Sequence, residues 1–211
     1  MLYNPPETTS EQVEENRKHY NERVAVYRRL GHDRESAIRF VVDIAEPLTV
    51  PVLDVGTGKG FTTIEIARRG VPVTSVDPSP EEIRIAHLNA REAGVDSRIE
   101  FHITNGERLP FEDGHFNLVT MVNVLHHLES YRGILAEISR VLAPDGRFVL
   151  ADFTAEGFDI LDRVHELEGR VHDRPGRFSV DDVSHFLPEF GMECRERDTR
   201  FQECVMLARR V

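Results

Sequence analysis

Three glycines at alternate positions, directly after a short apolar run, constrain this chain more than any other feature. Residues 50–55 are typical of a buried strand, and a helical pattern begins at Phe61. The segment between them reads Asp54-Val55-Gly56-Thr57-Gly58-Lys59-Gly60, here called the glycine loop. Glycine permits tight turns and close approach of a ligand to the main chain. Amide groups at the start of the following helix can then bind that ligand.

Two rival glycine patterns can be tested against this loop, and both fail. In the dinucleotide fingerprint G-x-G-x-x-G, the third glycine would fall on Phe61 or Thr63. In the P-loop pattern, the first glycine would fall on Leu53, and Ser or Thr would follow Lys59. Asp54 adds a carboxylate beside the loop. This charge suits a ligand with a cationic ammonium group and is unfavourable beside a pyrophosphate.

Asp77 is the second signal, because it follows the next apolar run, 23 residues after Asp54. An acidic residue about 20 positions past a glycine loop can accept hydrogen bonds from both hydroxyls of a ribose. An aspartate at a strand end can equally cap the helix that follows. We therefore expect a ligand with free 2′ and 3′ ribose hydroxyls, with helix capping as the alternative.

From residue 50 onward, short apolar runs alternate with helical patterns, which indicates strand–helix–strand units and a parallel sheet. We expect strands at 50–55, 72–76, 99–103, 116–122 and 147–151, and helices at 61–69, 80–93 and 130–142. Ser79 and Ser130 are the expected caps of the second and third of these helices. Two last strands, at 192–198 and 202–208, are joined by a tight turn and must run antiparallel to each other.

The flanks suggest four segments within one domain. Residues 1–47 predict a helical cap, in which Ser10 caps a helix with sparse apolar residues and a more apolar helix spans 33–46. Residues 48–152 form the expected ligand-binding core. Residues 153–178 break the alternation and predict an insertion on the substrate side, with a helix at 159–172. Residues 179–211 carry a helix, opened by a capping box of Ser179 and Asp182, and the antiparallel pair.

Charge and length narrow the classes of function. The chain has 211 residues with 26 basic and 37 acidic side chains, a formal net charge of −11. Such a surface repels phosphate backbones, so nucleic-acid binding is not expected. The N-terminus lacks the basic and apolar regions of a signal peptide, and no apolar run approaches the roughly 20 residues of a membrane span. We expect a cytoplasmic protein; the sequence leaves its oligomeric state open.

Taken together, several motifs in order resemble the class I methyltransferases that use S-adenosylmethionine (SAM). The glycine loop resembles their motif I, and Val76-Asp77-Pro78-Ser79 resembles motif II. Residues 105–111, beginning Asn105-Gly106-Glu107, resemble the segment around the adenine. Residues 113–119 with Asn123-Val124-Leu125-His126-His127-Leu128 resemble motif IV and its sequel, and residues 142–147 resemble the turn before strand five. The resemblance covers about residues 48–152 and is nearest to the type 11 group, similar to ubiquinone and menaquinone biosynthesis enzymes.

This resemblance implies an α/β, Rossmann-like fold with seven strands in the order 3-2-1-4-5-7-6, strand seven antiparallel, and helices on both faces. It also implies a set of residues around SAM, whose product would be S-adenosylhomocysteine. The methionine part would lie near the backbone of Gly56 and Gly58, with Asp54 nearby, and its amino group would face the backbone of Asn123. Thr57, Gly60 and Leu125 are further expected cofactor-binding residues. The nucleoside would lie near Asp77, Pro78, Asn105, Gly106 and Glu107. Asn105 departs from the usual aspartate, but an amide oxygen still accepts from the adenine amine.

Outside the cofactor motifs, the candidate residues are fewer. His126 or His127 is a candidate general base, with structural packing as the alternative. Tyr20 and Tyr27 of the first helix are expected to face the acceptor. His165, Glu168 and His172 share one face of the inserted helix, so His165 could contact substrate. A metal at these three side chains is the alternative, but a solvated charged face is favoured and no metal is expected.

The leading interpretation is therefore an enzyme that transfers a methyl group from SAM to a small-molecule acceptor by in-line displacement. Methylation of protein or RNA is an alternative. The tetrapeptide (N/D)-P-P-(Y/F) is absent after the fourth strand, where the chain reads Asn123-Val124-Leu125-His126. A SAM-binding sensor or pseudo-enzyme is a different class that the motifs leave open, and a nicotinamide-dependent dehydrogenase is the most distant alternative. The acceptor and the methylated atom are not encoded in any motif.

Overall fold

The computed structural model describes residues 1–4, 9–169 and 178–211, and within them a seven-stranded sheet in the order β3-β2-β1-β4-β5-β7-β6. β7 is antiparallel to both β5 and β6, and the pairs from β3 through β5 are parallel. The predicted α/β class, strand order and reversed strand are confirmed. The strands are β1 Val52–Val55, β2 Val73–Asp77, β3 Ile99–Ile103, β4 Phe116–Val122, β5 Leu142–Phe153, β6 Met192–Arg200 and β7 Glu203–Arg210.

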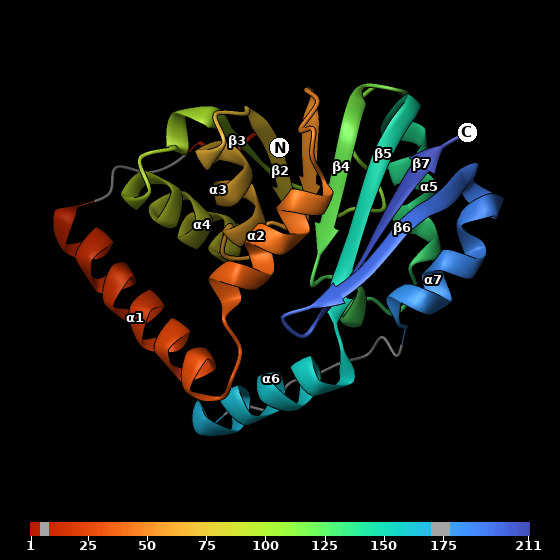
Figure 1. Cartoon of the computed structure of the whole chain (residues 1–211). Helices are drawn as coiled ribbons and strands as arrows, with labels where there is room; N and C mark the ends of the chain where they lie inside the picture. The colour runs from red at the N-terminus through yellow and green to blue at the C-terminus, as the bar shows by residue number, and fades with distance from the viewer. Residues whose placement is uncertain (5–8, 170–177) are drawn as a thin grey trace.

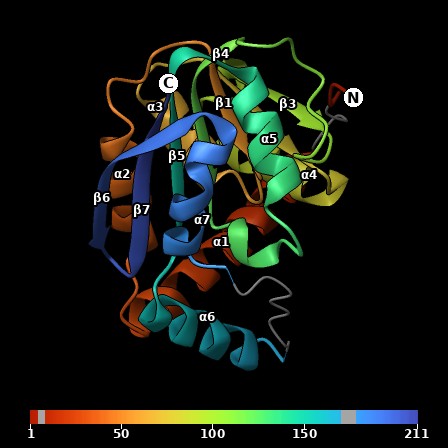
Figure 2. The ribbon, with the colours of Figure 1, turned by 90° about the vertical axis from the view of Figure 1, so that its right-hand side faces the viewer.

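Helices cover both faces of this sheet (Figures 1 and 2). They are α1 Ser10–Arg29, α2 Arg34–Ile44, α3 Phe61–Arg68, α4 Pro80–Glu92, α5 Arg132–Val141, α6 Ala155–Leu167 and α7 Val180–Phe186, with short 3-10 turns at Asp96–Arg98, Leu125–His127 and Leu187–Phe190. Alternate strand side chains point to opposite faces. Leu53 and Val119 pack in the core with α5 and α7, whereas Val52 and Leu118 pack with α2, α3 and α4.

Some helices are capped by the predicted side chains and others are not. The hydroxyl of Ser79 accepts from the backbone amide of Glu82 at 3.2 Å, and Ser179 forms the predicted capping box. The first helix is capped by Thr9 rather than Ser10, because the Thr9 hydroxyl accepts from the backbone amide of Gln12. The α5 helix starts at Arg132 with Tyr131 rather than Ser130 at the N-cap position, although the Ser130 hydroxyl accepts from the backbone amide of Arg132 at 3.4 Å.

The inserted helix also differs from its predicted bounds. It begins at Ala155, four residues early, because the side chain of Thr154 accepts from the amide of Gly157 at 3.2 Å. It ends at Leu167, with Glu168 as its C-cap. Of the three side chains predicted to share one helical face, His165 lies in this helix, Glu168 is its C-cap, and His172 lies outside the described residues. None of the described helices is long and apolar enough to cross a membrane.

Two helices from the flanks, α1 and α6, form a cap at one edge of the sheet. Figure 1 shows both beyond the end toward which the β4 arrow points, which is the carboxyl edge of the parallel strands. A separate small core joins them, in which Tyr27 of α1 packs with Phe153 at the end of β5 and with Leu161 and Val164 of α6. In open α/β sheets, ligands bind at this carboxyl edge. The cap therefore lies over the expected binding site.

The cap is also connected to the glycine loop through α4. The side-chain amide of Asn16 donates to Oδ1 of Asn89 at 2.7 Å, and Nδ2 of Asn89 donates to the carbonyl of Lys59 at 2.8 Å. Asn89 is 7 % exposed, so these bonds are shielded from water. One side chain thus joins the first helix to the main chain of the loop.

Candidate functional site

A cavity of about 640 Å³ lies at the carboxyl edge of the sheet, between the strand ends and the cap. This is within the volume range of small-molecule sites. Its walls come from the glycine loop, the ends of β2, β4 and β5, the loop after β3, and helices α1, α2 and α6. The sites predicted from motifs and from the flanks therefore meet in one cavity.

The glycine loop needs its glycines for different reasons. All three adopt left-handed φ angles, +85° at Gly56, +48° at Gly58 and +83° at Gly60. A Cβ at Gly56 would lie 2.2 Å from Cγ2 of Val124, so the main chain can approach the end of β4 only without a side chain. A Cβ at Gly58 would meet nothing within 4 Å, and Gly58 lines the cavity. Gly60 does not line it; it forms the N-cap of α3 and faces Ala86 of α4.

Asp77 connects the loop to the next strand. Its Oδ2 accepts from the amide of Gly58 at 2.8 Å, and its Oδ1 accepts from the amide of Ser79 at 2.9 Å. The side chain is 8 % exposed and lines the cavity. Asp77 thus braces the turn before α4 and presents a carboxylate at the cavity wall.

Asp54 does not line the cavity, which corrects the expectation that its charge faces the ligand. It is 1 % exposed, and its oxygens accept from the hydroxyls of Thr63, Ser75 and, at 2.7 Å, Thr120. Burial raises the pKa of the Asp54 carboxyl to about 6, although these hydrogen bonds oppose the shift. The carboxylate therefore fixes the strand and helix that flank the loop.

The segment after β3 contributes the opposite wall. Asn105, Gly106 and Glu107 line the cavity together with Pro78, as the nucleoside motifs imply. A Cβ at Gly106 would lie 3.2 Å from side-chain atoms of both Val55 and Ile134. Gly106 therefore allows this segment to pack tightly against the end of β1.

The end of β4 carries a strained asparagine beside a buried acid. Asn123 has a φ of +58°, lines the cavity, and donates from Nδ2 to Oε1 of Glu203 at 3.0 Å. Oδ1 of Asn123 and Oε2 of Glu203 are buried without a hydrogen-bond partner in the described part of the chain. Burial raises the pKa of Glu203 to about 8. The prediction that Leu125 contacts the cofactor is wrong, because Leu125 is fully buried in the α5 core and lines no part of the cavity.

His126 is paired with Asp152, a residue that belongs to none of the predicted motifs. Its Nδ1 lies 2.7 Å from Oδ1 of Asp152, and its amide donates to Oδ2 at 3.0 Å. His126 is 3 % exposed and lines the cavity, whereas His127 is exposed and contributes to the rim. Asp152 follows the predicted fifth strand directly, so an acid at that sheet edge was a usable signal.

The cap residues separate into two groups. Tyr27 is 1 % exposed and lines the cavity, as does His165, whose Nε2 lies 3.2 Å from Nη2 of Arg23. The expectation for Tyr20 is corrected: its ring packs on Phe61, with centroids 5.6 Å apart, and lines neighbouring hollows instead. Glu168 pairs with Arg23, and the described residues contain no cluster of three or more metal-binding side chains.

Comparison with known proteins places this site in a family. Residues 53–150 match the family model described as a methyltransferase domain. This region belongs to the class I methyltransferases of type 11. The methyltransferase region is 39 % identical over 103 residues to the demethylmenaquinone methyltransferase of Tropheryma whipplei (strain Twist), which covers 49 % of this chain and 41 % of that protein.

Two further relatives extend the comparison beyond the motifs. The 27-O-demethylrifamycin SV methyltransferase of Amycolatopsis mediterranei (strain S699) is 34 % identical, covering 67 % of this chain and 53 % of that protein. A crystal structure of a SAM-dependent methyltransferase from Methanosarcina mazei has a TM-score of 0.62 at 24 % identity, covering 76 % of this chain and 92 % of that one. The chain spans only about half the length of the curated relatives it matches.

Proposed function

We propose that this protein is an enzyme that binds SAM and transfers its methyl group to a small molecule. The observation that carries the proposal is the bond from the Gly58 amide to Asp77, which sets a glycine turn and a buried carboxylate side by side on one cavity wall. This is the arrangement needed to hold an amino-acid portion and a ribose of one ligand. The methyltransferase family of residues 53–150 supports the same assignment.

The residues of the cavity fit SAM part by part. Gly56 and Gly58 offer main chain to the methionine portion, and the buried Oδ1 of Asn123 is an acceptor suited to its ammonium group. Asp77 would accept from the ribose hydroxyls, and Asn105 and Gly106 would hold the adenine. Three residues would support this site without touching the ligand, because they hold the loop and the strand ends in place: Asp54, Gly60 and Leu125.

The chemistry asks the protein mainly for alignment. SAM supplies a methyl group on a sulfonium, which is already an activated leaving group. The cavity walls would hold the acceptor in line with that methyl, and the cap over the cavity would exclude water. When Nδ1 of a neutral His126 donates to Asp152, its lone pair lies on Nε2, so His126 can take the proton of an acceptor hydroxyl or amine. His127 at the rim is the second candidate for this role.

A small acceptor is favoured over a macromolecule by the cap. The cavity is bounded by Tyr27 of α1 and by Leu161 and His165 of α6, so a protein or RNA substrate would have to enter between these helices. The net charge of −11 further disfavours RNA. The relatives named above are described by quinone and natural-product acceptors, both small molecules.

Calorimetric titration with SAM and S-adenosylhomocysteine tests the proposal, with Asp77→Asn as the variant and Asp43→Asn, on the exposed end of α2, as the matched control. We expect binding by the wild type and the control, and a loss of about tenfold or more for Asp77→Asn. Release of S-adenosylhomocysteine in a screen of small acceptors then tests transfer. Absence of binding would refute the proposal, and binding without turnover on any acceptor pool would favour a sensor.

A further inference from the structure

Charge is segregated within the cavity. Its acidic side chains, Asp77, Glu82 and Glu107, come from β2, α4 and the loop after β3, which form the proposed nucleoside side. Its Lys and Arg side chains, Arg23, Arg34 and Lys59, come from α1, the start of α2 and the glycine loop. We call these three residues the cation cluster. The protein as a whole has a net charge of −11, so a generally basic composition does not explain this cluster.

Arg34 is held in place by aromatic rings rather than by an acid. Its guanidinium carbon lies 4.0 Å from the ring centre of Phe61 and 4.8 Å from that of Tyr27. No carboxylate in the described part of the chain lies within ion-pair distance of it. Stacking of this kind orients a guanidinium while leaving its N–H groups available. Burial, and to a lesser degree the nearby Arg23, lower the pKa of Arg34.

The other two cations are close enough to repel it. Lys59 has no ion pair among the described residues; burial lowers its pKa most, and Arg23 and Arg34 lower it further. Arg23 is paired with Glu168 at 2.8 Å, but its Nε is buried without a hydrogen-bond partner in the described residues. Glu82 and Glu168 act on the pKa of Lys59 in the opposite direction. Among the described residues, however, the pair of Glu168 with Arg23 is the one contact at ion-pair distance between a carboxylate and the cation cluster.

The nearby Glu203 does not complete the balance. It is 1 % exposed, and burial raises its pKa to about 8, so it carries a proton at neutral pH. Its hydrogen-bond partner is Asn123 rather than an arginine. The cation cluster therefore retains an excess of positive charge in a partly desolvated place, which is unfavourable until an anion enters.

We propose that the cation cluster binds an anionic group, a carboxylate or a phosphate, on the methyl acceptor. This inference rests on the proposed function, because it assigns the cap side of the cavity to the acceptor. Arg34 suits such a group because a guanidinium can donate two parallel hydrogen bonds to two oxygens, and Lys59 adds a point charge. The acceptor is thus an acid or a phosphate ester that carries its nucleophile at the other end.

The cofactor has a carboxylate of its own, so the test must separate two sources of negative charge. Calorimetry would first measure S-adenosylhomocysteine and 5′-methylthioadenosine, which lacks the amino-acid carboxylate, on the wild type, Arg34→Gln and Lys59→Gln. Protein saturated with S-adenosylhomocysteine would then be titrated with inorganic phosphate and with benzoate. Benzamide is the neutral counterpart of benzoate. Arg39→Gln, an exposed arginine of the same helix, is the matched control.

We expect phosphate or benzoate, but not benzamide, to bind the saturated wild type and Arg39→Gln, and to bind Arg34→Gln and Lys59→Gln about tenfold more weakly. Thermal unfolding checks that each variant folds. If Arg34→Gln loses its fold, Arg34→Lys and Lys59→Gln carry the test. Wild-type protein that binds S-adenosylhomocysteine but neither anion would overturn the inference and leave the proposed function standing.

A second result would also overturn it. If Arg34→Gln loses affinity for S-adenosylhomocysteine but keeps its affinity for 5′-methylthioadenosine, the cation cluster holds the cofactor's carboxylate instead. Failure of the wild type to bind S-adenosylhomocysteine would refute the proposed function, and this inference with it.

Discussion

Asp152 accepts two hydrogen bonds from one residue: His126 approaches it with Nδ1 at 2.7 Å and with its main-chain amide at 3.0 Å. Both side chains are nearly fully buried, 3 % and 2 % exposed. The double contact fixes the position of the backbone after β4 and the orientation of the imidazole ring. A histidine oriented by a carboxylate in this way resembles the base–orienter pairs of nucleophilic and acid–base sites. It makes His126, rather than the exposed His127, the stronger candidate for a general base.

Replacement of His126 by Gln should lower kcat by about 100-fold or more if His126 takes a proton from the acceptor. Affinity for S-adenosylhomocysteine should stay near that of the wild type, because the imidazole is not among the proposed cofactor contacts. His115→Gln, an exposed histidine at the opposite edge of the sheet, is the control. Steady-state kinetics and calorimetry check both parts; an unchanged kcat in the variant would remove His126 from the mechanism.

Asp152→Asn tests positioning rather than proton transfer. The amide can still accept the main-chain bond, but it no longer offers a charge to the ring. We expect kcat to fall and its pH profile to move, while the KM for SAM changes little. A purely structural Asp152 would instead lower the unfolding temperature without moving the pH profile of the remaining activity.

The glycines of the loop should respond differently to alanine. Gly56→Ala places a Cβ 2.2 Å from Val124 in a left-handed conformation, so it should lower the unfolding temperature markedly and abolish SAM binding. Gly58→Ala meets nothing within 4 Å, so it should fold and lose cofactor affinity. Gly94→Ala, also left-handed and unobstructed, measures the backbone strain alone. Equal unfolding temperatures for Gly56→Ala and Gly94→Ala would contradict the close approach.

Glu203 should make stability depend on pH in a definite direction. Its pKa rises from an ordinary value of 4.5 to about 8 in the folded protein, so the folded state binds more protons between these values. Stability is then lost as pH rises from about 4.5 to 8. Glu203→Gln removes this loss and can still accept from Asn123. The difference in unfolding temperature between variant and wild type should therefore grow in the variant's favour with pH; a constant difference would show that Glu203 titrates normally.

The core of the fold was predictable because its signals are local. A strand, a glycine turn and a helix at residues 50–69 follow from apolar period and turn chemistry, and the antiparallel end follows from a short connection. The orientation of single side chains did not follow in the same way. Asp54 is the first residue of the glycine loop yet does not line the cavity, and Leu125 follows Asn123 by two residues yet lies in the core.

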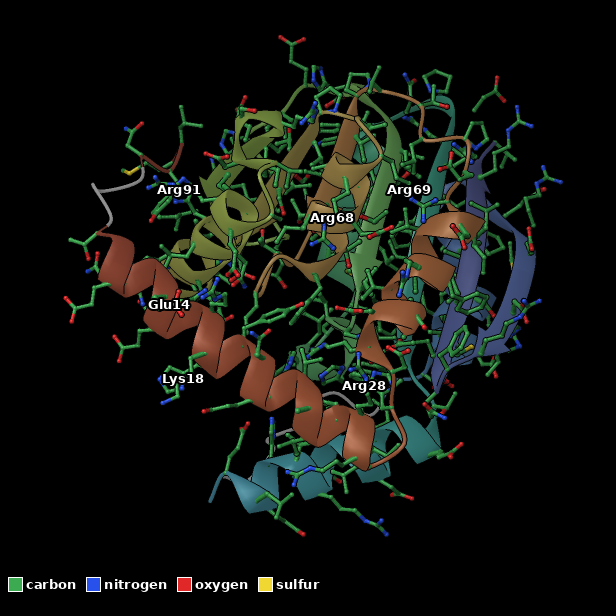
Figure 3. The ribbon with its side chains drawn as sticks, turned by 60° about the vertical axis from the view of Figure 1, so that its left-hand side comes forward. Glu14, Lys18, Arg28, Arg68, Arg69 and Arg91 are labelled. Atoms are coloured by element: carbon green, nitrogen blue, oxygen red, sulfur yellow. The ribbon has the colours of Figure 1, made fainter. Side chains whose placement is uncertain are left out.

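The residues on the cap side of the site could not be predicted from the sequence, because they come from elements that are distant along the chain. Arg34 and Glu203 belong to no motif: Arg34 of α2 lines the cavity, and Glu203 of β7 reaches it only through its hydrogen bond from Asn123. Residues that tertiary structure brings together from distant parts of the chain show no characteristic spacing in the sequence. Tyr20 and Tyr27 lie seven residues apart on one helix, yet Tyr27 lines the cavity whereas the ring of Tyr20 packs on Phe61. Figure 3 shows this helix with its exposed Glu14, Lys18 and Arg28.

The bridge from Asn16 through Asn89 to the carbonyl of Lys59 has a consequence for how such proteins diversify. On the loop side, the bridge contacts only a main-chain carbonyl, so it does not depend on which side chains the loop carries. A foreign first helix could be grafted onto this scaffold, provided that it presents an amide donor to Asn89. Exchange of the N-terminal helix could then change the preference for the methyl acceptor, while the residues proposed to bind the methyl donor SAM stay the same.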